Sequence, residues 1–142
     1  MALFVGNNIL VPIDFSDKAQ KALKDTLDFV SDPQKVHVIN VLSPLEPTEP
    51  GVVWQTVDNQ TRIDRVTEVF YERFPEDGYK QLKFTVAIGN PSSEILDYAK
   101  HNSIDLIVIP SSGRTGLSRF FLGSVAERIV RFSHCPVLVT RE

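Results

Sequence analysis

The sequence predicts an α/β domain, an open five-stranded parallel sheet with helices on both faces. Strand-like apolar runs alternate with helix-like amphipathic segments along all 142 residues, which is typical of parallel strands joined by right-handed crossovers. Residues 106–109 and 137–139 are apolar at consecutive positions, as expected of strands that helices cover on both sides. The length fits one domain, so we assign residues 1–142 to a single unit with a short lead at 1–7.

The first strand is predicted at Ile9–Ile13, an apolar run that stops at the capping residues 14–17. The first helix follows from Ala19, with apolar residues three and four positions apart, and ends at Pro33. Val36–Leu42 is the second strand. Residues 43–53 form a loop with prolines at every third position, which favours an extended segment that can lie over a site as a lid.

The second helix is predicted from the one-sided apolar pattern of residues 63–74 and ends at Pro75. A turn at Glu76–Gly78 leads into the third strand, Leu82–Val86, whose alternation indicates one solvated side. The third helix begins where Asn90 precedes a proline suited to the first helical position, and it runs to about residue 102. The fourth helix begins at Ser124, between the fourth and fifth strands.

Composition excludes several function classes. Fifteen Lys and Arg against 18 Asp and Glu give a net charge of −3 without a basic run, so nucleic-acid binding is not expected. The single cysteine, Cys135, cannot form an internal disulfide, which fits a reducing cytoplasm. No stretch resembles a signal peptide or reaches bilayer length, so we expect a soluble cytoplasmic protein without membrane contact. The three histidines have no second ligand at metal spacing, so no metal site is expected.

The segment 110–124 holds three of the seven glycines, between a strand-like run and a helix-like one. A loop that brings backbone N–H groups close to an anion needs residues without Cβ, and the following helix adds its positive N-terminal end. Ligands of parallel sheets bind beyond the carboxyl ends of the strands, where the strand order reverses. Asp14 and the glycine-rich segment both follow strands, so we expect a nucleotide there.

Each candidate residue also has a purely structural interpretation. Ser124 and Glu127 spell a Ser-x-x-Glu capping box, so Ser124 is either a helix cap alone or a cap and a phosphate ligand. Asp14 either caps the first helix, alone or with Ser16, or contacts a nucleoside. Arg114 either offsets phosphate charge or is a solvated surface charge.

The chain resembles the universal stress protein family, some of whose members bind ATP while others do not. The ATP-binding members carry Gly, two residues, Gly, nine residues and Gly-Ser or Gly-Thr, and Gly113 with Gly123-Ser124 matches the last two parts of this motif. Pro110 replaces the first glycine, and proline has no backbone N–H to offer a phosphate. Three further stretches are also similar: Val11–Ser16, Gly89–Leu96 and Cys135–Thr140.

The resemblance implies the fold of the adenine nucleotide alpha hydrolases, with strand order 3-2-1-4-5. It also implies an ATP site, with or without Mg²⁺, in which Asp14 lies beside the nucleoside, the backbone of Val41 meets the adenine and the glycine loop receives phosphates and ribose. The binding residues expected on this basis are Pro12, Asp14, Val41, Ser112, Gly113, Arg114, Gly123, Ser124 and Val125. Losing one donor at Pro110 costs roughly 1.5–3 kcal/mol, a weakening of about tenfold to a hundredfold.

Catalysis is not expected beyond slow ATP hydrolysis. The sequence has no Gly-Lys-Ser/Thr loop, no kinase motif set and no Gly-x-Ser-x-Gly turn, and Asp14 is the only candidate base.

Two functional hypotheses follow. The first is a stress-response protein in which ATP occupancy changes a surface that a protein partner reads. The second is an interaction protein of the same fold whose loop binds no nucleotide. In either case the resemblance implies a homodimer through the last strand, Pro136 to Arg141, and an unpaired apolar edge there would be an aggregation hazard.

Overall fold

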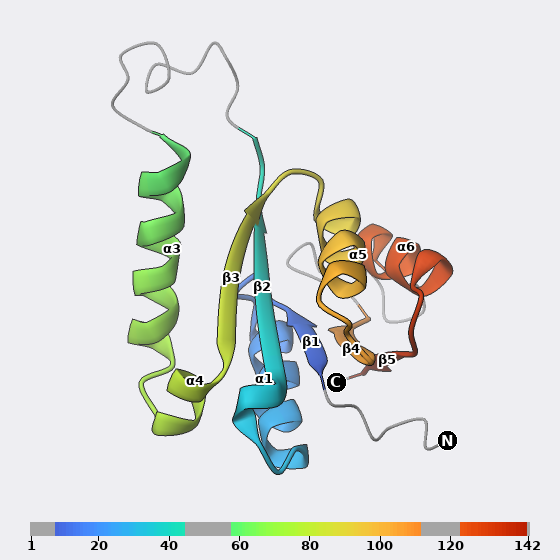
Figure 1. Ribbon diagram of the computed structural model, residues 1–142, viewed down its shortest axis with the longest axis horizontal. Coiled ribbons are helices and arrows are strands. Elements are labelled where there is room, and N and C mark those ends of the chain that lie inside the picture. The colour runs from blue at the N-terminus through green and yellow to red at the C-terminus, as the bar shows by residue number, and fades with distance from the viewer. Residues whose placement is uncertain (1–7, 45–57, 112–122, 142) are drawn as a thin grey trace.

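The computed structural model describes residues 8–44, 58–111 and 123–141. Its centre is a sheet of five parallel strands in the order β3-β2-β1-β4-β5 (Figure 1). The strands are β1 (Ile9–Pro12), β2 (Val36–Leu42), β3 (Lys83–Ile88), β4 (Leu106–Pro110) and β5 (Val137–Thr140). The fold and strand order expected from the sequence are confirmed.

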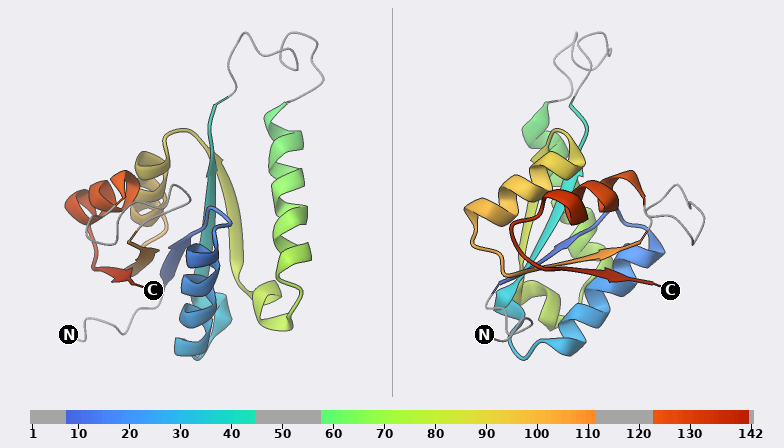
Figure 2. Two further views of the ribbon diagram at one scale, coloured as in Figure 1. Left: turned by 180° about the vertical axis from the view of Figure 1, so that it is seen from behind. Right: turned by 90° about the vertical axis from the view of Figure 1, so that its right-hand side faces the viewer.

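Helices cover both faces of the sheet (Figure 2). On one side lie α1 (Asp17–Phe29) and α3 (Asn59–Arg73), and on the other lie α5 (Pro91–His101) and α6 (Ser124–Phe132). The 3-10 helix η1 (Pro33–Lys35) precedes β2, and the short α4 (Asp77–Gln81) connects α3 to β3. None of the described helices is long and apolar enough to cross a membrane.

Two apolar cores, one on each face, hold these layers together. Side chains alternate along β1, so that Val11 packs with Leu23 of α1 and Phe70 of α3, whereas Leu10 packs with residues of α5 and α6. On the first face the rings of Phe70 and Phe84 stack with centroids 4.1 Å apart, which fixes α3 against β3. Both faces of β1 are therefore buried, in keeping with its unbroken apolar sequence.

Side-chain caps determine where three of the helices begin. Ser16, Asp58 and Asn90 each accept a hydrogen bond from the backbone N–H three residues later, at 3.2, 2.7 and 3.1 Å. Pro91 occupies the first helical position of α5, as predicted. The residue before this cap is Gly89 with φ 152°, where a Cβ would collide with the side chain of Glu94.

The structure corrects the sequence prediction between α3 and β3. The predicted turn at 76–78 is instead largely part of the short helix α4, in which Tyr79 turns inward and packs its ring 4.8 Å from that of Phe74. β3 runs from 83 to 88, and five of its six residues are half-buried instead of alternating with solvent. Most of the proline-rich loop predicted at 43–53 lies outside the described residues.

Candidate functional site

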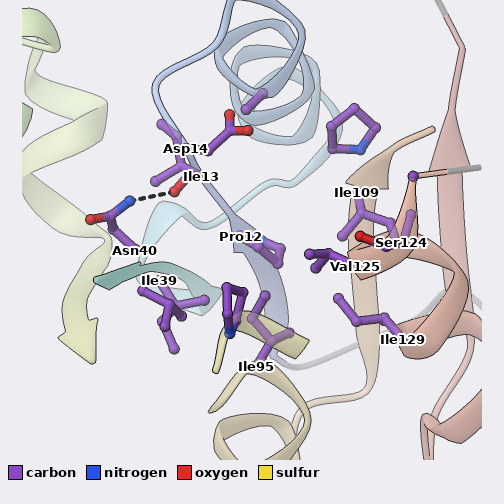
Figure 3. A pocket seen from close by; sticks show the side chains of 16 residues that line it. Pro12, Ile13, Asp14, Ile39, Asn40, Ile95, Ile109, Ser124, Val125 and Ile129 are labelled. Atoms are coloured by element: carbon purple, nitrogen blue, oxygen red, sulfur yellow. Dashed lines mark hydrogen bonds between the residues drawn. The ribbon is translucent and has the colours of Figure 1, made fainter. Parts of the chain in front are cut away.

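A pocket of about 330 Å³ opens at the carboxyl ends of β1, β2 and β4. Residues from the N-terminal parts of α5 and α6 close its other side (Figure 3). This is the point at which the chain order of the sheet reverses, since β1 lies between β2 and β4. Most of its surface is apolar, and five isoleucines contribute to it: Ile13, Ile39, Ile95, Ile109 and Ile129.

Six of the nine residues expected at the site line this pocket. They are Pro12, Asp14, Val41, Gly123, Ser124 and Val125. The other three, Ser112, Gly113 and Arg114, lie outside the described residues. Pro110, the residue in place of the family's first glycine, lines the pocket as well. The fold thus brings together residues more than 100 positions apart in the chain.

Asp14 lies in a sharp turn between β1 and α1. Its Oδ1 accepts the backbone N–H of Ser16 at 3.0 Å, while the hydroxyl of Ser16 caps α1. Phe15 between them has φ 61°, a left-handed conformation that turns the chain away from the sheet. Ser16 is therefore the cap of α1, and Asp14 orients the capping residue from the rim of the pocket.

The expectation that Ser124 caps α6 is wrong. The cap position belongs to Gly123, whose N–H donates to the Ser111 carbonyl at 2.8 Å and whose own carbonyl accepts the Glu127 N–H at 2.9 Å. Glu127 pairs with Arg131 at 2.9 Å instead of forming a capping box. Ser124 is the first helical residue, and a helix leaves the N–H groups of its first turn without helical partners. The positive end of α6 is therefore directed at the pocket.

Two prolines explain why the central strands separate at this pocket. β1 and β4 pair only at Ile9–Leu106 and Leu10–Ile107. In a longer ladder the next two bonds would need the N–H of Pro12 and then that of Pro110, which proline lacks. On the β5 side Pro110 costs no ladder bond, because the Ser111 N–H donates to the Thr140 carbonyl at 3.0 Å.

Sequence reasoning missed Asn40 and the isoleucines. Asn40 is only 7% exposed and donates its Nδ2 to the Ile13 carbonyl at 2.7 Å (Figure 3). Its signal in the sequence is a single amide in the apolar run of β2, which points to a specific buried partner. The isoleucines carried no such signal, because apolar residues in a sequence look the same whether they line a pocket or fill a closed core.

The described residues contain no group of three or more His, Cys, Asp or Glu side chains that could hold a metal ion. Among these residues the pocket offers separate polar groups around an apolar interior: the carboxylate of Asp14, the amide of Asn40, and the hydroxyl and helix end at Ser124.

Fold and pocket together define a doubly wound α/β domain that presents a ligand-sized pocket at its switch point. Residues 7–141 match the model of the universal stress protein family. The universal stress protein MJ0531 of Methanocaldococcus jannaschii is 30% identical over 94% of this chain and 81% of its own. The universal stress protein YxiE of Bacillus subtilis is 31% identical over 95% of this chain and 99% of its own. The chain belongs to the universal stress protein family.

Solved structures are similar over nearly the whole chain. The universal stress protein UspA of Lactobacillus plantarum has a TM-score of 0.72 and 28% identity, covering 95% of this chain and 97% of its own. A family member of Arabidopsis thaliana solved with AMP bound has a TM-score of 0.63 and 18% identity, covering 96% and 92%. A universal stress protein in complex with cAMP has a TM-score of 0.59 and 18% identity, covering 95% of this chain and 96% of its own. The last two, at that identity, share the fold alone.

Proposed function

We propose that this protein binds an adenine nucleotide, ATP with or without Mg²⁺, in the pocket at the switch point, and that it acts as a nucleotide-responsive stress protein of the cytoplasm. The observation that carries the proposal is the opposed placement of two polar elements across an apolar pocket. Asp14 lies on the β1 side and the N-terminal end of α6 on the other.

The chemistry of the pocket suits such a ligand. Apolar walls from Ile39, Ile95 and Ile109 offer a surface for a flat base, and a carboxylate at Asp14 accepts hydrogen bonds from a nucleoside. The N–H groups that begin α6 attract an anion, as helix N-termini do. By the family motif, Ser112, Gly113 and Arg114 would add contacts to the phosphates.

Two structural relatives support an adenine nucleotide as the ligand class. The Arabidopsis thaliana protein was solved with AMP and another family member with cAMP. Both ligands share the adenosine moiety, so the apolar pocket of this chain is assigned to the adenosine and the end of α6 to the phosphate.

A second candidate function rests on Pro110. A proline in place of the first motif glycine removes one backbone donor, and an interaction protein with no nucleotide affinity would tolerate that loss. The protein would then act through its surfaces, as a homodimer. No catalytic residue is proposed in either case.

Calorimetric titration of the nucleotide-stripped protein with Mg·ATP, and with GTP as the control, distinguishes the two candidate functions. The proposal requires ATP-selective binding in the micromolar range. No detectable heat up to millimolar ATP would refute it and leave the interaction protein as the function.

A further inference from the structure

The junction between β1 and β2 contains an unusual exchange of hydrogen-bond donors. The two strands pair in register up to Pro12 opposite Ile39, and the Ile13 N–H donates to the Ile39 carbonyl at 2.8 Å. In a continued parallel ladder the next donor, to the Ile13 carbonyl, would be the N–H of Val41. The side chain of Asn40 occupies that acceptor instead, with Nδ2 at 2.7 Å.

This exchange has a consequence for Val41. Alternate residues of β2 direct their backbone groups to β1 and to β3, and Leu42 is bonded on the β3 side, where its carbonyl accepts the Gly89 N–H at 2.9 Å. The N–H and carbonyl of Val41 therefore face the side of β1. There β1 has already ended at Pro12, and Val41 lines the pocket.

The same hydrogen bond fixes the peptide that precedes Asp14. With its carbonyl bound to Asn40 and its N–H bound to Ile39, Ile13 is anchored to β2 at both backbone groups. The left-handed turn at Phe15 follows directly, and the carboxylate of Asp14 bonds the N–H of Ser16. Asn40 thus holds the base of the turn that presents Asp14 to the pocket.

We propose that Asn40 is the positioning residue of this site: by taking the place of the Val41 N–H at the Ile13 carbonyl, it keeps the Val41 backbone open to the ligand. A purine edge that carries an acceptor beside a donor matches the N–H and carbonyl that a single strand residue directs to one side. This assignment of a ligand rests on the proposed function, whereas the release of the Val41 N–H does not.

Burial supports a specific role for this side chain. At 7% exposure an amide loses its water, and one good hydrogen bond only roughly offsets that loss. A leucine or valine at position 40 would pack in the core on this face without the cost of desolvating an amide. The amide is useful here because an apolar residue would leave the Ile13 carbonyl to capture the Val41 N–H.

The first experiment measures amide hydrogen exchange of the protein without nucleotide. We expect the Val41 amide to exchange at least tenfold faster than that of Ile39, which is bonded within the ladder. In Asn40→Ala the Val41 amide should become protected, because its N–H then closes the ladder with Ile13. Equal protection of Val41 and Ile39 in the unmodified protein would overturn the proposal without any variant being needed.

The second experiment titrates AMP into both proteins. Loss of one ligand hydrogen bond and of the fixed Asp14 turn should weaken binding by about tenfold or more. Thr26→Val is the matched control, since it removes another buried hydrogen bond, from Thr26 Oγ1 to the Ala22 carbonyl at 2.7 Å, in the core away from the pocket. It should leave both the Val41 exchange rate and the AMP affinity unchanged.

The outcomes separate the two proposals. If the unmodified protein binds no AMP or ATP, the proposed function fails, and the exchange rates still decide whether Asn40 frees Val41. If it binds and Asn40→Ala binds equally well, the positioning role is refuted while the nucleotide site stands.

Discussion

At the scale of single residues, Asp14 is a polar group that the sequence predicts at the site and that lines the pocket. Its position comes from the end of β1, and its orientation from the hydrogen bond with the Ser16 N–H. The hydroxyl of Ser16 caps α1 without Asp14, so removing the carboxylate leaves that cap in place.

We therefore predict that Asp14→Ala lowers nucleotide affinity more than it lowers stability. Loss of a charged hydrogen bond is worth about 1.5–3 kcal/mol, or about tenfold to a hundredfold in affinity. Calorimetric titration with Mg·ATP checks this, with the exposed Asp28→Ala on α1 as the control. An affinity unchanged in Asp14→Ala would remove Asp14 from the site.

Pro110 gives the second prediction at this scale. Pro110→Gly supplies an N–H on the side of β4 that faces β1 and the pocket, so ATP affinity should rise by about tenfold to a hundredfold if a phosphate uses that donor. Pro75→Gly, remote from the pocket after α3, is the control. An unchanged affinity would remove the argument that the proline at 110 weakens nucleotide binding.

At the scale of elements, α5 is tied to β2 by a buried polar pair. His37 is 3% exposed, and its Nδ1 lies 2.7 Å from the hydroxyl of Tyr98. Among the described residues its Nε2 has no hydrogen-bond partner. Burial lowers the pKa of His37 below its usual value of 6.5, and the positive charge of Lys83 on β3 lowers it further. The neighbour of His37 on β1 is Leu10, which carries no charge.

This pair makes stability depend on pH in a defined direction. In the unfolded chain His37 binds a proton below about pH 6.5, whereas in the fold it binds one only at lower pH, so stability is full above 6.5 and falls as the pH is lowered. We predict that the unfolding midpoint in urea decreases between pH 7 and pH 5, and that His37→Gln reduces this decrease. As the control, His101→Gln, which replaces an exposed histidine on α5, should keep the full pH dependence.

At the scale of the whole molecule, β5 forms one edge of the sheet. Even-numbered residues of β5 direct their backbone groups to β4, since the Thr140 carbonyl accepts the Ser111 N–H, so those of Val137 and Val139 face outward. Leu138 leaves 46% of its surface exposed on this strand. An edge of this kind favours pairing with a second copy.

We predict a homodimer through β5 in solution. Leu138→Lys should shift the protein to the monomer at micromolar concentration, because it places a charge where the exposed part of a leucine, worth roughly 1 kcal/mol, would be buried. Sedimentation velocity measures this, and Phe29→Lys, which replaces another exposed apolar residue on α1, is the control. A monomeric unmodified protein would refute the dimer.

The sequence alone determined the alternation of strands and helices, because burial on both faces makes parallel strands continuously apolar and because Asn90-Pro91 and residues 14–17 mark helix starts. It also predicted that Asp14 and the glycine-rich segment follow the carboxyl ends of strands. A local sequence pattern does not show which elements pack together. The short helix α4 depends on the packing of Tyr79 against Phe74, and the sequence therefore predicted a turn there.

Only the tertiary structure decided the remaining features of the site. Gly123 caps α6 because Ser111 binds its N–H, a contact between residues 12 positions apart. Asn40 belongs to the site because β1 ends beside it. Pro12 and Pro110 separate β1 from β4 because, in the register of these strands, the next two ladder bonds would both need an N–H that a proline lacks. A sequence fixes which groups each residue offers, whereas their partners depend on distances that exist only once the sheet has formed.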